Sequence, residues 1–283
     1  MKQLIKLSRL VAAVGLVACA TKEPEPASDA QPAQAAVRVV EVVTGDYFYQ
    51  FPDTLTAGLV TMRLHNNGKE LHHVMAFRLP EGKTYADFMT EAAKAPHPPQ
   101  WAAPVGGPNT PAPGAVSETS LELAAGNYAV VCVIPSPDGV PHVAKGMSKA
   151  LVVTPPVNAA PVAAPAPTVT MTLTDYDFVL STPLTAGDHL IRVETAAEQP
   201  HEVVIAKLEP GKTALELAQW AEKPVGPPLG LPLGGTSAIA KGGYNLVKVR
   251  LEPGEYALIC FIPDAKDGRP HYHHGMVKQI SVS

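Results

Sequence analysis

Apolar and polar residues alternate along several short segments of the chain. The alternation is clear at 60–64 (VTMRL), 169–173 (VTMTL) and 247–251 (VKVRL). A period of two indicates β-strands with one buried face. Because these segments are short and are separated by turns rich in glycine and proline, they favour a β-sandwich over an α/β fold.

Two segments depart from this period. Residues 84–94 and 213–223 are rich in helix formers, and each stops before a proline. A proline cannot continue a helix, so each segment predicts one short helix. The predicted fold class is therefore all-β with two short helices.

The chain repeats itself at a spacing of 128 or 129 residues. The matching segments are DY at 46 and 175, LTAG at 55 and 184, GKT at 82 and 211, GG at 106 and 234, and GM at 146 and 275. Collinear matches of this kind indicate a tandem duplication. We expect two Greek-key β-sandwich domains at 37–154 and 168–283, each with one short helix. The Ala/Pro-rich segment 155–167 between them is typical of an extended, semi-rigid linker.

The first residues have the pattern of an export signal. Three basic residues precede a short apolar run that ends at residue 18 and is too short to span a bilayer. Small residues directly before Cys19 resemble the bacterial lipobox, so we expect a lipoprotein signal peptide at 1–18, lipidation of Cys19 and a disordered tether at 19–36. An ordinary signal peptide or an uncleaved anchor is the alternative. We expect the protein to be exported and lipid-anchored in the cell envelope, in the outer membrane facing the periplasm or at the cell surface.

Composition and charge limit the classes of function. Removal of residues 1–18 leaves 19 basic and 26 acidic residues, a net charge of −7 with neutral histidines, and no basic patch is visible. Nucleic-acid binding is therefore not expected. The 30 prolines against six phenylalanines favour ordered domains on stiff connectors over one large enzyme core.

The end of each repeat carries soft metal-binding side chains in the same order. They are Cys132, His142 and Met147 in the first repeat, and Cys260, His271 and Met276 in the second. A thiolate, an imidazole and a thioether on one loop suit a copper ion better than a hard cation. The alternatives are ordinary core residues, or a disulfide between the two cysteines, which would have to link two domain interiors.

The duplication also selects a second histidine. His72 aligns with His201, whereas His73 aligns with Glu202, which is not a ligand for this kind of site. A trigonal site of two histidines and one cysteine with a weak axial methionine needs such a residue from a neighbouring strand. The expected ligand sets are His72, Cys132, His142 and Met147 in the first repeat, and His201, Cys260, His271 and Met276 in the second.

These residues resemble the cupredoxins, the blue copper proteins that include plastocyanin and azurin. The resemblance is carried by a His-x-Val segment, a Gly-x-Tyr-x-x-x-Cys approach and a Cys-x(n)-His-x(n)-Met loop. The loops, Cys-x9-His-x4-Met and Cys-x10-His-x4-Met, are longer than those of the small electron carriers and closer to the loop of copper nitrite reductases. The resemblance implies type 1 copper, up to two ions per chain, passing single electrons to redox partner proteins of the cell envelope. The membrane contact would be through the N-terminal lipid only.

The residues beside each cysteine favour electron transfer over catalysis. Multicopper oxidases and nitrite reductases place a histidine directly beside the ligand cysteine, which connects the blue site to a second copper site. Here the neighbours are Val131 and Val133, and Ile259 and Phe261. We therefore expect an electron carrier and not an enzyme. Two alternatives stay open: a copper storage or delivery protein, and a metal-free interaction module.

Overall fold

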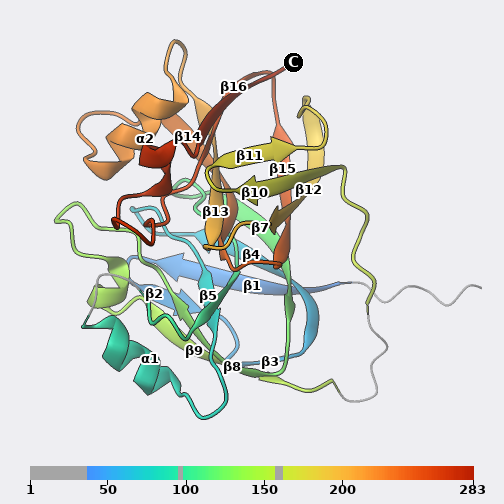
Figure 1. Ribbon diagram of the computed structural model, residues 1–283, viewed down its shortest axis with the longest axis vertical. Coiled ribbons are helices and arrows are strands. Elements are labelled where there is room, and N and C mark those ends of the chain that lie inside the picture. Colours follow the sequence, from blue (N-terminus) through green and yellow to red (C-terminus); the bar gives the residue numbers. More distant parts are fainter. Residues whose placement is uncertain (1–36, 95–97, 157–161) are drawn as a thin grey trace, which may run out of the picture. The chain divides into compact units, whose positions relative to one another are not determined.

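A computed structural model describes residues 37–94, 98–156 and 162–283. The expected signal peptide 1–18, Cys19 and the tether 19–36 lie outside the described residues. Strands dominate the described part and each repeat has one α-helix (Figure 1), so the all-β prediction is confirmed. No helix in the described ranges is both long enough and apolar enough to cross a membrane.

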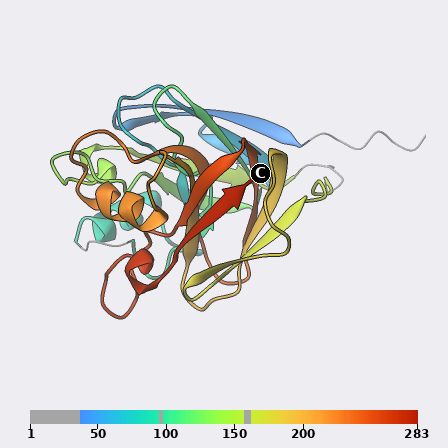
Figure 2. The same ribbon diagram turned by 90° about the horizontal axis from the view of Figure 1, so that it is seen from above.

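The elements follow the same order in both repeats, except that the first repeat has one additional short strand, β3. The first repeat contains β1 (Arg38–Gly45), β2 (Phe48–Gln50), β3 (Thr54–Thr56), β4 (Gly58–Asn66), β5 (Met75–Arg78), α1 (Tyr85–Ala92), β6 (Ala103–Gly106), β7 (Val116–Leu123), β8 (Gly126–Val131), the 3₁₀ turn η1 (His142–Lys145) and β9 (Ser148–Thr154). The second contains β10 (Val169–Thr174), β11 (Asp177–Leu180), β12 (Gly187–Thr195), β13 (His201–Leu208), α2 (Ala214–Glu222), β14 (Gly230–Ile239), β15 (Tyr244–Leu251), β16 (Gly254–Ile259), η2 (His271–His274) and β17 (Val277–Val282). Figure 2 shows the last of these, β17, as the red strand that ends at the C-terminus.

Both predicted helices form, and both start in the same way. Thr84 and Thr213 are the N-caps, and each side chain accepts a hydrogen bond from the backbone N–H three residues on. Asp87 and Glu216 return a side-chain bond to the N-cap backbone, which completes a capping box. Because this box satisfies backbone groups that the first helical turn leaves free, it fixes where each helix begins.

The strands form two mixed sheets, and each sheet runs through both repeats. One has the order β11-β10-β12-β15-β7-β4-β1-β2, and the other has the order β17-β16-β13-β14-β6-β5-β8-β9-β3. Most neighbours are antiparallel, but β1 and β4, β10 and β12, and β3 and β9 pair in parallel. Within β10 the predicted alternation is observed, since Val169, Met171 and Leu173 are buried and the threonines between them are partly exposed.

The repeats join through strand pairs that cross between them. β7 pairs with β15 along four residue pairs, from Glu118–Lys248 to Leu121–Asn245, and β6 meets β14 at Val105 and Ile239. The repeated glycine pairs lie at this junction. A Cβ on Gly235 would lie 2.0 Å from the carbonyl oxygen of Val203. Only glycine lets β13 and β14 of the second repeat approach so closely here. A Cβ on the neighbouring Gly234 would lie 2.6 Å from Cβ of Ser117 in the first repeat.

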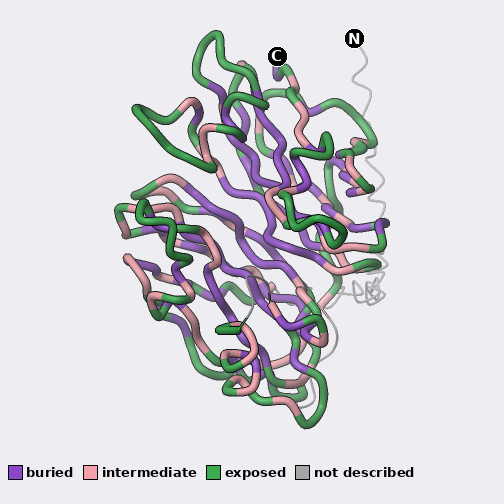
Figure 3. The backbone as a smooth tube through the Cα atoms, turned by 60° about the vertical axis from the view of Figure 1, so that its left-hand side comes forward, coloured by how far each residue is buried: buried purple, intermediate pink, exposed green. Residues whose placement is uncertain are grey.

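Each repeat has its own sandwich core, in which the expected sulfur ligands take part. Cys132 and Met147 pack with Met62, Leu64 and Tyr128 in the first core, together with other apolar residues of the first repeat. Cys260 and Met276 occupy the equivalent places in the second core. In Figure 3 the buried residues follow the inner strands and the exposed residues follow the loops. The sulfur ligands are therefore held by packed strands and not by surface loops.

Candidate metal centres

The first centre gathers residues from three places in the first repeat. His72 lies between β4 and β5, Cys132 directly follows β8, and His142 begins η1. Nδ1 of His72 lies 3.1 Å from Nδ1 of His142, and Sγ of Cys132 lies 3.4 Å from Nδ1 of His142. The side chains of all three are fully buried. The structure thus brings two imidazole nitrogens and a thiol together at one point.

The second centre repeats this arrangement. His201 begins β13, Cys260 directly follows β16, and His271 begins η2. Sγ of Cys260 lies 3.9 Å from Nδ1 of His201 and 3.5 Å from Nδ1 of His271. These three residues are also fully buried. Both cysteines are free, which excludes the disulfide alternative for this structure.

One pattern of backbone hydrogen bonds holds both ligand loops. In the first loop the N–H of Cys132 donates to the carbonyl of Met147 (3.1 Å), and the N–H of Met147 donates to the carbonyl of His142 (2.9 Å). The second loop has the same two bonds, from Cys260 to Met276 (3.2 Å) and from Met276 to His271 (3.1 Å). The extra residue of the second loop lies in the turn between Pro263 and Pro270, which corresponds to the turn between Pro135 and Pro141 in the first loop. The backbone bonds at Cys260, His271 and Met276 do not involve this turn. The unequal loops therefore present their ligands in the same way.

The two methionines of the predicted ligand sets are buried in the same cores as the ligand groups. Met147 and Met276 each follow a glycine that ends the 3₁₀ turn with a φ of 104° or 102°. This left-handed backbone conformation favours glycine, and it turns the chain back into the core. Both methionine side chains are fully buried in the same cores as the ligand cysteines.

Carboxylates hold the far edges of the imidazole rings. Nε2 of His72 lies 3.2 Å from Oδ1 of Asp46, and Nε2 of His142 lies 2.8 Å from Oε2 of Glu70. A carboxylate accepts hydrogen bonds, so each neutral ring keeps its proton on Nε2 and directs the Nδ1 lone pair toward the cysteine sulfur. In the second centre, Asp175 holds Nε2 of His201 at 2.6 Å.

The carboxylate over the second histidine has changed position between the repeats. Glu70 aligns with Gln199, and Ser136 aligns with Asp264. In the first centre the carboxylate is Glu70, and in the second it is Asp264, which receives hydrogen bonds from Tyr176 (2.5 Å) and Gln199 (2.9 Å). Oδ2 of Asp264 lies 3.8 Å from Nε2 of His271. This distance exceeds a hydrogen bond, and Nε2 of His271 has no other partner among the described residues.

A tyrosine covers each centre beside this carboxylate. Tyr47 packs edge-on against His142 with ring centroids 5.2 Å apart, and its hydroxyl donates to Glu70 (2.7 Å). Tyr176 packs against His271 at 5.4 Å. The DY match at 46 and 175 marked both of these tyrosines and both aspartates, although the sequence alone gave them no role. The sequence gave no such signal for Glu70 and Asp264, because neither carboxylate has an acidic residue at the equivalent position of the other repeat.

Burial disfavours the charged forms of both cysteines and of three of the histidines. It raises the pKa of Cys132 to about 12 and the pKa of Cys260 further above its usual range. Burial also lowers the pKa of His72 and of His201, and lowers that of His271 to about 4. Backbone N–H groups of His73 and Ile134 oppose the shift at Cys132, since they favour the thiolate. A cation that binds here must displace the thiol proton.

These donor sets fit a copper ion. Two Nδ1 lone pairs and one sulfur face a common point, and the donors of each centre all lie within 4.8 Å of one another. Histidine and cysteine donors about 2.0 and 2.3 Å from a metal ion produce separations of this size. A trigonal set of two histidines and one cysteine beside a methionine is the set that type 1 copper uses.

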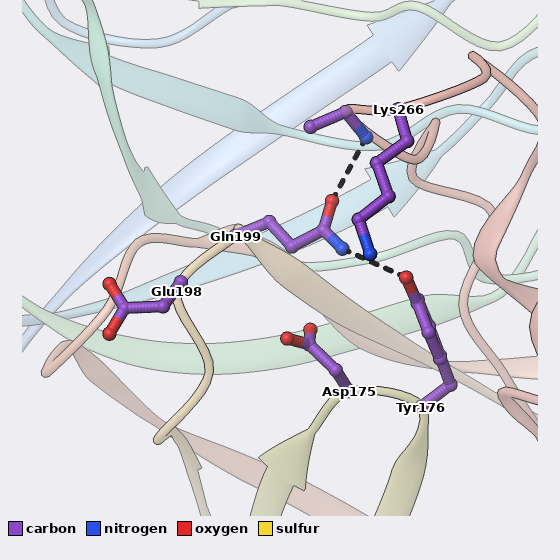
Figure 4. Close-up of a pocket in the computed structure, with 6 residues that line it drawn as sticks. Asp175, Tyr176, Glu198, Gln199 and Lys266 are labelled. Atoms are coloured by element: carbon purple, nitrogen blue, oxygen red, sulfur yellow. Dashed lines mark hydrogen bonds between the residues drawn. The ribbon is translucent and has the colours of Figure 1, made fainter.

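The described residues contain one further group of potential metal ligands, made of Asp264, Asp267 and His274. Asp264 is already bonded to Tyr176 and Gln199, and Asp267 is exposed, as is His274. A shallow cavity of 390 Å³ opens beside this group, lined by Asp175, Tyr176, Glu198, Gln199, Ala265 and Lys266 (Figure 4). Because Asp175 contacts His201 and Tyr176 contacts His271, this cavity is the solvent side of the second centre.

Comparisons with known proteins give likenesses of fold. No family model matches the chain, and no curated protein matches it. The auracyanin of Roseiflexus castenholzii is 21% identical with a TM-score of 0.31, over 43% of this chain and 100% of that one. Auracyanin A, a blue copper protein of Chloroflexus aurantiacus, is 20% identical with a TM-score of 0.31, over 42% and 100%. A multicopper oxidase is 13% identical with a TM-score of 0.27, over 87% and 89%. At these values the likenesses assign no function.

Proposed function

We propose that the protein carries single electrons through two type 1 copper centres, one in each repeat. The observation that carries this proposal is the repeated, fully buried group of two Nδ1 atoms and one cysteine sulfur beside a methionine. A bound copper ion would supply a one-electron change between Cu(II) and Cu(I). The soft donor set suits copper better than it suits calcium, magnesium or manganese.

The surrounding residues support electron transfer because they resist rearrangement. Asp46 and Glu70 fix the two imidazole rings of the first centre, and the backbone bonds around Cys132 fix the ligand loop. Both sulfur ligands lie in packed cores, where side chains keep single conformations. A donor set held in this way changes little when the charge at the centre changes by one.

Catalysis is disfavoured by the residues beside the cysteines. Val133 and Phe261 follow the ligand cysteines directly, at the place where a multicopper enzyme has a histidine. The further group at Asp264, Asp267 and His274 has no counterpart in the first repeat, where Ser136 aligns with Asp264. We therefore propose a carrier and not an oxidase or reductase.

We further propose that the carrier works in the cell envelope, anchored by a lipid on Cys19 and exchanging electrons with redox proteins there. The support is the signal-like segment 1–18 and the small residues directly before Cys19. Mass spectrometry of the mature N-terminus should find an acylated Cys19. Cys19→Ser should release the protein from the membrane fraction, and its retention there would contradict the anchor.

The copper proposal is tested by adding Cu(II) to the purified protein. We expect an intense visible thiolate-to-copper band, about two coppers per chain and reversible one-electron cycling. Cys132→Ser and Cys260→Ser should each remove about half of the band, and the double variant should remove it all. Tight Cu(I) binding without this band would instead support storage or delivery. A wild-type spectrum like that of the double variant would rule out type 1 copper.

A further inference from the structure

The junction between the repeats has a local two-fold arrangement. With a spacing of 128, Pro108 is equivalent to Thr236, and these two residues bridge each other across the junction. Thr119 is equivalent to Val247, and these two also pair, at the contact of β7 with β15. The N–H of Asn109 donates to Gly235, and the N–H of its equivalent Ser237 donates to Gly107 (3.1 and 2.9 Å). The residues nearest this axis therefore come from equivalent places in the two repeats.

Each centre extends a buried polar side chain toward this axis. His73 follows the ligand His72, and Glu202 follows the ligand His201; their exposed fractions are 3% and 4%. Neither joins the groups of metal ligands. Nε2 of His73 accepts a hydrogen bond from the N–H of Val133 (3.2 Å), and Oε1 of Glu202 accepts one from the N–H of Phe261 (3.1 Å). Since Val133 and Phe261 directly follow the ligand cysteines, each side chain is bonded to the backbone of its own centre.

Asn109 connects these two side chains. It belongs to the first repeat and is 1% exposed, and its Nδ2 donates to Oε2 of Glu202 in the second repeat (3.1 Å). On the other side, the N–H of Val74, which follows His73, donates to the carbonyl of Pro108, which precedes Asn109 (2.9 Å). A continuous path of covalent and hydrogen bonds thus runs from Cys132 through His73, Asn109 and Glu202 to Cys260.

We infer that His73, Asn109 and Glu202 form the electron path between the two centres. This inference rests on the proposed function. One electron leaves the reduced centre and enters the oxidised one, so the first is oxidised and the second is reduced. No proton has to move, because both ends of the path are backbone N–H groups. Coupling between two sites passes through contiguous bonded contacts, and this path is such a contact across the junction.

The competing explanation is that Asn109 only satisfies buried polar groups where the repeats meet. Asn245 provides a matched control for that role. It is also 1% exposed and also crosses the junction, since Oδ1 accepts from the N–H of Gly107 (3.1 Å) and Nδ2 donates to the carbonyl of Val105 (3.1 Å). In the hydrogen bonds of the described residues, Asn245 contacts neither His73 nor Glu202. Its loss should weaken the junction without opening the path.

The test measures electron exchange between the centres in the full, copper-loaded chain. A short pulse of reductant reduces part of the copper. Absorption and freeze-quench EPR then follow the redistribution of electrons between the two centres. Cys132→Ser and Cys260→Ser give the spectrum of each centre alone. We expect a redistribution phase whose rate is independent of protein concentration. Asn109→Ala should slow it several-fold, and Asn245→Ala should leave it near the wild-type rate.

A second variant and a metal-free measurement keep the test decisive. His73→Phe removes the acceptor at the other end of the path, so it should slow the exchange as Asn109→Ala does. If one of these two variants folds poorly, the other still tests the path. In the metal-free chain, ¹⁵N NMR should show the Phe261 amide signal shifting in Asn109→Ala and not in Asn245→Ala, because Asn109 donates to the carboxylate that accepts the Phe261 N–H. Equal rates in Asn109→Ala and wild type, or equal slowing by both asparagine variants, would overturn the inference. A missing thiolate-to-copper band in wild type would instead overturn the proposed function.

Discussion

Each ligand histidine is positioned by what its outer nitrogen contacts. The first centre holds Nε2 of His142 at hydrogen-bond distance from Glu70, whereas the second leaves Nε2 of His271 3.8 Å from Asp264. A carboxylate on the outer nitrogen raises the basicity of the ligand nitrogen and fixes the ring. The two centres therefore differ most at this contact.

Glu70→Gln tests this contact. Loss of the charge should lower the Cu(II) affinity of the first centre about tenfold, the small end of the range for outer partners of metal ligands. A competitive chelator titration in a Cys260→Ser background measures that centre alone. Adding Ser136→Asp reproduces the pairing of Gln199 with Asp264 and should restore part of the affinity. An unchanged affinity in Glu70→Gln would show that the carboxylate does not support the ligand.

A tyrosine near the ligand cysteine also distinguishes the first centre from the second. Tyr49 is buried in the same core as Cys132 and donates to the carbonyl of His73 (2.5 Å), whereas the equivalent residue in the second repeat is Phe178. The polarity around the cysteine sulfur tunes the potential of a type 1 site.

Tyr49→Phe should raise the potential of the first centre. The hydroxyl proton is donated to the carbonyl of His73, so the variant removes a polar group from the core around the sulfur and not a bond to it. A less polar site disfavours the more highly charged Cu(II) state, and about 1 kcal/mol corresponds to about 40 mV for one electron. A spectroelectrochemical titration of the Cys260→Ser background, with and without Tyr49→Phe, measures the shift. The second centre, measured in Cys132→Ser, serves as the control and should not move. A shift of equal size in both centres would assign the effect to the fold and not to the hydroxyl.

At the scale of elements, the sequence predicted what depends on local pattern. The period of two located strands such as β4, β10 and β15, and the helix formers of 84–94 and 213–223 located α1 and α2. The order of soft ligands predicted which two histidines and which cysteine meet in each centre. The sequence did not reveal the roles of Glu70 and Asp264, because these depend on a contact between two loops. Nor did it show that loops of unequal length share one backbone pattern, because that pattern consists of main-chain bonds.

The glycine before each methionine provides a test of that backbone pattern. Gly146 has a φ of 104°, and a Cβ there would meet no atom within 4 Å, so only the backbone conformation resists substitution. Gly146→Ala should destabilise the metal-free protein by about 1–3 kcal/mol in urea unfolding. Gly146→Asn should cost less, because asparagine tolerates a positive φ. If alanine and asparagine cost the same, the conformation is not the cause.

At the scale of the whole molecule, the Ala/Pro linker suggested two separate bodies, yet the sheets continue from one repeat into the other. The boundary residues of β7 explain why the pattern did not show this. Ser117 and Thr119 are polar but buried, because their hydroxyls donate to the carbonyls of Asn109 (2.7 Å) and Gly235 (2.9 Å). A polar residue that is buried by bonding to a partner strand has the same sequence pattern as an exposed one.

Cleavage of the linker tests this union of the repeats. A protease recognition sequence inserted within 155–167 should allow the chain to be cut while the two halves still elute together in size-exclusion chromatography, since β7 and β15 stay paired. Uncut protein with the same insertion is the control. Separation of the halves under native conditions would show that the junction is too weak to hold them.

The pairing of Pro108 with Thr236 and of Thr119 with Val247 has an evolutionary consequence. A surface on which each residue meets its own counterpart is isologous, and a single unfused copy would carry it as a homodimer interface. Gene duplication and fusion then require no new surface, because the joined halves keep the contact that their ancestor had. Fusion also frees each half to mutate alone. His73 and Glu202 at equivalent places, with Asn109 bonded to Glu202 across the junction, are an asymmetry that no homodimer can encode.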